Sequence, residues 1–175
     1  MTVPRRRWSA GALTLALAGS LLAGAPSPAA ATGGPSEHQQ DLAAARAATA
    51  EYHNVQKALD DGYAEDPHCV AVPGLGTMGH HYVNIDNLNS TDPEEPFALL
   101  YAPRRDGTLR LVAVEYLVTS ASTGGSRPSM FGVDFDGPMD EHARNTTGTH
   151  YDLHVWAWAH NPEGMFAQFN PSLSC

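Results

Sequence analysis

Lysine, cysteine and the short motifs of common enzyme classes are scarce or missing in this sequence. The chain has one lysine and two cysteines among 175 residues. It has no Cys-x-x-Cys-His, no glycine-rich phosphate loop and no Gly-x-Ser-x-Gly turn. Their absence removes c-type haem attachment, P-loop nucleotide binding and α/β-hydrolase chemistry from consideration. Beyond the N-terminal region, no apolar run is long enough to cross a bilayer.

The N-terminal region is typical of a secretory signal peptide, which we predict over residues 1–31. Arg5 to Arg7 precede an apolar run from Ala10 to Ala23, and small residues follow at Ala29 to Ala31. An ordinary secretory signal fits better than a twin-arginine signal, which stays an alternative because of the arginines before Trp8. We therefore expect a secreted, extracellular protein in which residues 32–175 form a single domain.

The predicted mature chain is strongly acidic. It keeps seven of the ten basic residues and all nineteen acidic ones, a formal net charge of −12. Such a surface repels nucleic acid and anionic lipid, so we expect neither as a partner. The net charge does not exclude a small-molecule ligand, and it does not predict the oligomeric state.

The two cysteines, Cys69 and Cys175, predict a disulfide, because an even pair in an exported protein is most often oxidised. The bridge would tie the end of the chain to its middle. It would close a loop of roughly 100 residues, worth up to ~4.7 kcal/mol by chain entropy. The alternative is two free thiols, one of them a metal ligand, which the terminal position of Cys175 disfavours.

One helix is predicted at the start of the domain. Ser36 and Gln39 form a capping box, apolar residues recur at three- and four-residue steps up to Leu59, and Gly62 ends the helix. Strands and turns follow. The strands are predicted over residues 78–85, 97–101, 109–118 and 151–159. The fold class is therefore α+β, with the N-terminal helix packed on a curved antiparallel sheet or a small open β-barrel.

Histidine is abundant where lysine is scarce, and four of the nine histidines lie in or directly before two predicted strands. His80 and His81 are adjacent in the first strand, whereas His150 directly precedes the last strand and His154 lies four residues further along, inside it. In a strand that spacing is ~13 Å, too far for both to bind one ion directly. Adjacent residues point to opposite faces, so one of His80 and His81 would be a ligand, and the mixed polar face of the strand favours His80.

Glu115 is the unusual residue of the third predicted strand, because it stands in the otherwise apolar run from Leu111 to Val118. A carboxylate buried there needs a cationic partner, a proton or a bound metal. A salt bridge to Arg110 or Arg127 would be a purely structural explanation. A metal ligand or a general base is the functional one.

These residues predict a mononuclear metal site built from His80 or His81, Glu115 and His154. The ion would be a divalent transition metal, namely Zn, Cu, Fe or Mn. An open coordination position would permit Lewis-acid or redox chemistry on a small organic molecule, although the pattern assigns no catalytic residue and no reaction. A ligand pocket beside the ion is predicted from Tyr82, His150, Asp152 and Trp156. The alternative is a non-catalytic ligand-binding or envelope interaction module with structural histidines.

Several longer motifs support relatedness to other proteins. They are Met78-Gly79-His80-His81-Tyr82-Val83-Asn84, Phe135-Asp136-Gly137-Pro138-Met139, and His150 to Trp158 continuing into Asn161-Pro162-Glu163-Gly164-Met165-Phe166. Together they resemble a family of small exported bacterial proteins over nearly the whole predicted mature chain, which implies export but no activity. A looser resemblance to cupins implies only a strand-based architecture and imidazole–carboxylate chemistry. Cupin sites use His-x-His and a nearby glutamate, whereas here the histidines are adjacent and Glu115 comes much later.

Overall fold

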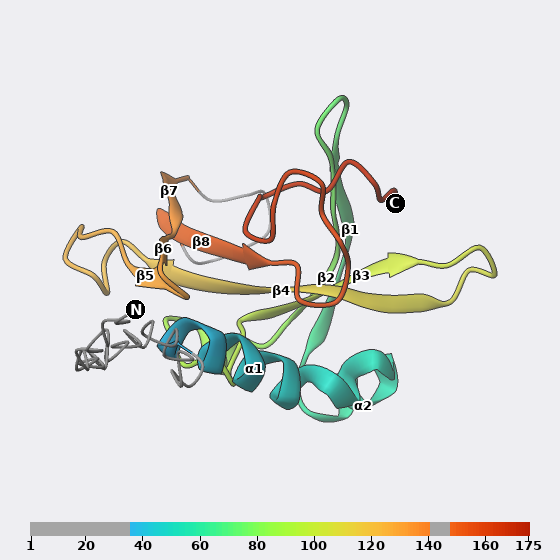
Figure 1. Ribbon diagram of the computed structural model, residues 1–175, viewed down its shortest axis with the longest axis horizontal. Coiled ribbons are helices and arrows are strands. Elements are labelled where there is room, and N and C mark those ends of the chain that lie inside the picture. The colour runs from blue at the N-terminus through green and yellow to red at the C-terminus, as the bar shows by residue number, and fades with distance from the viewer. Residues whose placement is uncertain (1–35, 141–147) are drawn as a thin grey trace, which may run out of the picture. The chain divides into compact units, whose positions relative to one another are not determined.

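An antiparallel sheet of six strands, in the order β1-β2-β3-β4-β8-β7, forms the centre of the fold (Figure 1). The computed structural model describes residues 36–140 and 148–175, so the predicted signal peptide lies outside the described residues. The strands of the sheet are β1 (Ala64–Val72), β2 (Gly76–Val83), β3 (Ala98–Pro103), β4 (Leu109–Thr119), β7 (Asp136–Met139) and β8 (His150–Val155). Because β1 and β7 are edges that do not pair with each other, the sheet is open. The predicted α+β class is confirmed, with a sheet and not a closed barrel.

The predicted single helix is divided in two. The capping box of Ser36 and Gln39 opens α1 (Glu37–Thr49), as predicted. A 3-10 turn, η1 (Ala50–His53), then separates α1 from α2 (Val55–Asp60). The side chain of Asn54 accepts a hydrogen bond from the backbone N–H of Gln56 and so begins a second helix. A side chain that caps a new helix competes with continuation of the old one, which explains the break.

The strand predictions hold for the centre of the sheet, but neither edge strand was predicted, and the strand predicted over 151–159 ends at Val155. The predicted strands over 97–101 and 109–118 are β3 and β4, with ends within two residues. The prediction missed β1, which contains Pro67 and has register shifts that interrupt its pairing with β2. Proline and bulges are typical of edge strands, where a missing N–H costs no ladder bond. The described residues after β4, 120–140, contain β7 and a separate ribbon of β5 (Ser129–Met130) and β6 (Val133–Asp134).

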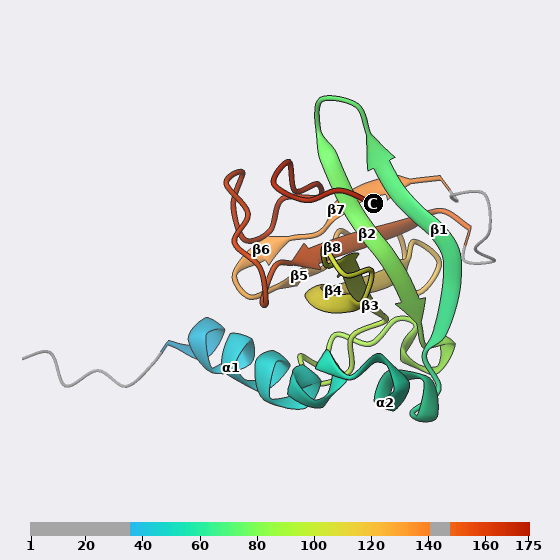
Figure 2. The same ribbon diagram turned by 90° about the vertical axis from the view of Figure 1, so that its right-hand side faces the viewer.

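The two faces of the sheet are covered differently, as Figures 1 and 2 show. Helices α1 and α2 cover one face, where Tyr151, Leu153 and Val155 of β8 pack into a cluster with Ala45 and other helix residues. The predicted packing of the N-terminal helix on the sheet is confirmed. The C-terminal segment, residues 156–175, covers the opposite face, where it adds Trp156 and Phe169 to a second cluster. We call these the helix face and the C-terminal face.

The predicted disulfide is present and holds the C-terminal segment in place. Cys69 of β1 and Cys175 are bonded, with their Cα atoms 5.7 Å apart. A backbone bridge between Thr77 of β2 and Asn170 adds a second attachment near the same end of the sheet. The end of the chain is therefore attached to the sheet at two points, although most of its last five residues are exposed.

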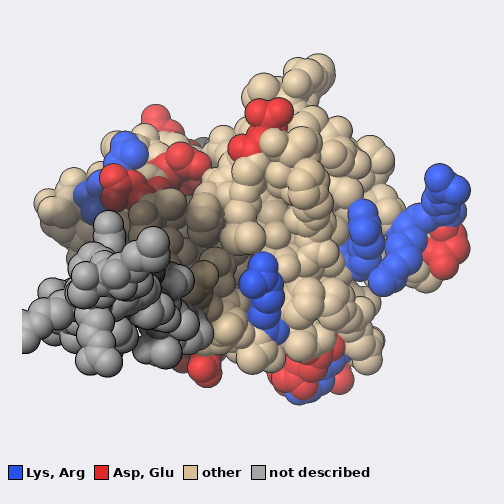
Figure 3. Space-filling view, in the orientation of Figure 1, with Lys and Arg blue, Asp and Glu red and all other residues tan. Residues whose placement is uncertain are grey.

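Charged side chains are dispersed over the surface. In the view of Figure 3, lysine and arginine occur in small separate groups and form no continuous stripe. Over the described ranges, no helix has both the length and the apolar character needed to cross a membrane.

Candidate metal centre

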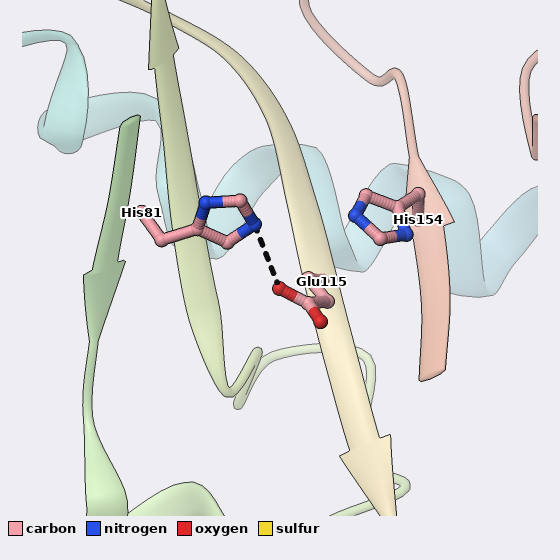
Figure 4. A group of neighbouring side chains, drawn as sticks. All are labelled: His81, Glu115 and His154. Atoms are coloured by element: carbon pink, nitrogen blue, oxygen red, sulfur yellow. Dashed lines mark ion pairs between the residues drawn. The ribbon is translucent and has the colours of Figure 1, made fainter. Parts of the chain in front are cut away.

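Three side chains with metal-binding atoms converge on the C-terminal face of the sheet (Figure 4). They are His81 from β2, Glu115 from β4 and His154 from β8. One ligand atom from each lies within 4.8 Å of the others. Glu115 is 6% exposed and His154 is fully buried, whereas 13% of the His81 side chain is exposed. The group is nearly enclosed, and His81 is its most accessible member.

The register of the sheet explains the convergence. Glu115 lies directly opposite His154 on β8 and opposite Ala98 on β3. Residues directly opposite each other share a face, so the side chains of Glu115 and His154 are neighbours. His81 belongs to β2, which is separated from β4 by β3. The small, fully buried Ala98 occupies the intervening strand beside Glu115, so that the longer histidine and glutamate side chains can meet across it. Sequence reasoning missed this role of Ala98.

The prediction that His80 would be the ligand is wrong, because alternation along this strand is interrupted. Gly79 has a φ of 102°, and an added Cβ would lie 2.7 Å from the carbonyl oxygen of Tyr101. Beyond this irregularity the register places His80 opposite Tyr101, a residue of the helix face, and His81 opposite Leu100, a residue of the C-terminal face. A bulge shifts every later side chain to the other face.

His81 and Glu115 lie close together in the site and form an ion pair when His81 is protonated. His81 Nε2 lies 3.4 Å from Glu115 Oε2. Burial alone would lower the pKa of His81, but the hydrogen bond and the charge of Glu115 outweigh it and raise that pKa. Burial likewise opposes ionisation of Glu115, but the hydrogen bond from His81 and the charges of the neighbouring histidines lower its pKa. The carboxylate is therefore held ionised by imidazoles.

A salt bridge from Glu115 to Arg110 or Arg127, the structural explanation that the sequence left open, is not formed. Arg127 instead donates to the backbone carbonyl of Gly137. Across the described ranges, the ion pairs of Glu115 and of Asp152 are with histidines. A buried carboxylate without lysine or arginine is consistent with a site that accepts a cation.

The four predicted pocket residues are divided between the two faces. Tyr82 packs on the helix face with its ring centroid 4.8 Å from that of Tyr101, so its grouping with the site is wrong. His150, Asp152 and Trp156 lie on the C-terminal face and are all buried. Trp156 donates from Nε1 to the carbonyl of Ala167, so the C-terminal segment covers this residue of the predicted ligand pocket.

Asp152 lies beside His154, one of the three metal-binding candidates. Its Oδ1 is 3.9 Å from Nδ1 of His154. Burial raises the pKa of Asp152, and the negative charges of Glu115 and Asp136 raise it further. The site thus contains a second carboxyl group behind one of its imidazoles.

Two nitrogen donors and one oxygen donor are a known combination for catalytic and mononuclear transition-metal sites. Ligand atoms around a tetrahedral zinc ion are about 3.4 Å apart, given bond lengths near 2.1 Å. The atoms of this group lie within 4.8 Å of one another, so small side-chain rotations would bring them to that spacing. His81, Glu115 and His154 can therefore hold a metal ion.

Comparison of the chain with protein-family models, with curated proteins and with solved structures found no match. The resemblance to small exported bacterial proteins stays a prediction, and a function has to be argued from the geometry of the site.

Proposed function

We propose that the protein is exported and binds one divalent transition-metal ion through His81, Glu115 and His154. The observation that carries this proposal is the convergence of two imidazoles and a carboxylate from three separate strands, with ligand atoms within 4.8 Å of one another in a nearly enclosed position. Residues this far apart in sequence share a position only because the sheet register brings them together.

The charges around the site support a cation. Glu115 is buried on a face whose other buried side chains include apolar residues, imidazoles and the carboxyl group of Asp152, and the described residues place no lysine or arginine in an ion pair with it. Leaving a carboxylate in such surroundings is costly unless a cation compensates it. A bound metal ion would provide that compensation and would replace the proton that His81 shares with Glu115. Zinc, copper, iron and manganese all accept imidazole and carboxylate ligands.

Three protein ligands leave at least one coordination position for water or for a small organic molecule. His81 is the most exposed ligand, so the open position is reached from its side. Lewis-acid or redox chemistry on a small molecule is the activity class that such a position supports. Export is supported by the signal-like N-terminal sequence and by the Cys69–Cys175 disulfide, which suits an oxidising compartment.

The experiment is elemental analysis of the mature protein after separate loading with Zn²⁺, Cu²⁺, Mn²⁺ and anaerobic Fe²⁺, followed by dialysis. We expect about one equivalent of at least one metal. His81→Ala and His154→Ala should each lose it. His80→Ala is the matched control, because it removes the adjacent histidine from the opposite face and should retain the metal.

Two results would overturn the proposal. A wild-type protein that retains no stoichiometric metal under any of these conditions would rule out the site. Loss of metal in His80→Ala together with retention in His81→Ala would show that the ion is bound on the other face. Circular dichroism and thermal unfolding of each metal-free variant establish that it is folded.

A further inference from the structure

Asp152 is a buried acid that is not one of the three candidate metal ligands, so its burial needs a separate explanation. It stands two residues before His154 on β8, so both side chains are on the C-terminal face. Asp152 is 2% exposed, and its Oδ1 makes no hydrogen bond. In the register it lies opposite Leu117 of β4 and Asp136 of β7, neither of which offers a positive charge.

The nearest group of opposite character is the imidazole of His154. Nδ1 of His154 lies 3.9 Å from Asp152 Oδ1, about 1 Å beyond a hydrogen bond. With Nδ1 on the side of Asp152, Nε2 is the nitrogen left for an ion. Figure 4 shows a ring nitrogen of His154 turned toward Glu115. The two nitrogens of His154 thus have two different neighbours, a carboxyl group and the ligand group.

We propose that Asp152 is the positioning residue of the metal site: it accepts a hydrogen bond from Nδ1–H of His154 while Nε2 of His154 binds the ion. This inference rests on the proposed function. A small rotation of either side chain closes the 3.9 Å separation to a hydrogen bond. The bond holds His154 in one tautomer and one ring orientation, and it strengthens Nε2 as a donor.

The arrangement also explains why an acid occupies this position. Across residues 36–140 and 148–175, no lysine or arginine forms an ion pair with Asp152. A divalent ion on the far side of His154 would favour the ionised form of Asp152 through the imidazole, against the burial that otherwise raises the pKa of this carboxyl group. Carboxylates behind metal-binding histidines are usual in metal sites, and removing such a partner typically lowers metal affinity by about 10–100-fold.

The first measurement is Zn²⁺ affinity by competition with a chromophoric chelator. Asp152→Asn keeps the shape but weakens the hydrogen bond, and Asp152→Ala removes it. We expect a loss of roughly 10-fold for the first and up to about 100-fold for the second. Asp136→Asn is the matched control, because it removes the same charge from the exposed residue directly opposite Asp152 and should leave Zn²⁺ affinity within about threefold of wild type.

The second measurement separates positioning from a merely structural role. Long-range ¹H–¹⁵N spectra of the Zn²⁺-bound protein, labelled with ¹⁵N-histidine, report which nitrogen of each histidine binds the ion. We expect His154 to bind through Nε2 and to carry a strongly hydrogen-bonded proton on Nδ1. That proton signal should move upfield in Asp152→Asn, whereas the signals of His81 stay unchanged. A change in packing alone would not select one proton of one histidine.

Three outcomes would overturn the inference while leaving the metal site itself standing. The first is wild-type Zn²⁺ affinity in Asp152→Ala. The second is binding of His154 through Nδ1. The third is loss of one coordinating oxygen in Asp152→Ala, seen by X-ray absorption at the zinc edge, which would make Asp152 a direct ligand. A wild-type protein that binds no Zn²⁺ or other metal would instead defeat the proposed function. Unfolding of the metal-free variants in urea shows that each one is folded.

Discussion

The two faces of the sheet bury polar groups in different ways. On the helix face, the polar groups are mainly tyrosine hydroxyls, and they donate to backbone carbonyls: Tyr63 to Pro96, Tyr101 to Tyr52 and Tyr116 to Pro93. Burial raises the pKa of each of these tyrosines, so they stay neutral. On the C-terminal face, the buried polar groups include two acids and two histidines from β4 and β8.

This difference shows that the requirements of folding explain the polar groups buried on the helix face but not the ionisable groups buried on the C-terminal face. A neutral hydroxyl with a backbone acceptor completes its own hydrogen bonding and stabilises the core. Ionisable groups such as Glu115 and Asp152 cost free energy when buried, and among the residues that the structure describes they form ion pairs with imidazoles alone. The helix face therefore serves the fold, and the C-terminal face combines the fold with a group of side chains that could hold a metal ion.

The largest expected effect tests the cover of the C-terminal face. Replacing both Cys69 and Cys175 with serine should lower the free energy of unfolding by about 2–5 kcal/mol, because the bridge closes a long loop. Hydrogen exchange should speed up most in residues 156–175 and much less in α1, since the disulfide attaches the C-terminal segment and not the helix. Urea unfolding and hydrogen exchange by mass spectrometry measure the two effects. An equal increase in hydrogen exchange in α1 would show that the stability of the helix face depends on the cover of the C-terminal face.

The second prediction concerns the carboxylate of the site. Glu115→Gln keeps the shape but removes the charge, so metal affinity should fall by more than about 100-fold, because even outer partners of metal ligands are worth 10–100-fold. The metal-free fold should survive, since the amide oxygen still accepts from His81. Isothermal titration with the best-bound metal measures the loss, and Glu65→Gln on the edge strand β1 is the exposed control. Unchanged metal affinity in Glu115→Gln would leave Glu115 a structural residue.

The third prediction is a pH dependence of the metal-free protein. Because the pKa of His81 is raised in the folded protein, protonation of His81 stabilises the fold. This stabilisation is complete below about pH 6.5 and is lost as the pH rises through the pKa of folded His81. Because the pKa of Glu115 is lowered in the folded protein, ionisation of Glu115 also stabilises the fold. This stabilisation is complete above about pH 4.5 and is lost as the pH falls through the pKa of folded Glu115. The pair should therefore contribute most between these limits, by about 1.5–3 kcal/mol. The stability difference between wild type and His81→Gln, measured by urea unfolding across pH, should peak there, and a flat difference would contradict the pairing.

The sequence predicted the class of fold and the residue types of the site better than it predicted their placement. Glu115 and His154 were found because a carboxylate and a histidine in apolar strands are unusual. The choice of His80 was wrong because alternation assumes a regular strand, and Gly79 interrupts it. β1 was missed because Pro67 is read as a turn residue unless the strand is known to be an edge. Neither the interruption at Gly79 nor the proline within β1 can be located from the sequence, because each depends on how the strand pairs with its neighbour.

The contribution of Ala98 was hidden for a related reason. Its importance comes from lying opposite Glu115 on β3, and register is a property of two strands and not of either sequence alone. The cover over Trp156 depends likewise on the path of residues 156–175, which the disulfide and the Thr77–Asn170 bridge determine. Local patterns identified the chemistry, and long-range pairing decided which side chains met.

The smallest expected effect tests whether the two faces are independent. Tyr101→Phe removes the hydroxyl that donates to the carbonyl of Tyr52 over 2.6 Å. The free energy of unfolding should fall by about 0.5–1.5 kcal/mol, the net worth of such a hydrogen bond. Metal affinity should stay within about threefold of wild type, because the side chain points away from the site. Tyr101 is nevertheless next to Leu100, which lies opposite His81, so a distortion of β3 would reach the site. A clear loss of metal affinity in Tyr101→Phe would therefore show that the helix face positions His81 through the backbone of β3, and that the division between a structural face and a metal-binding face is too strict.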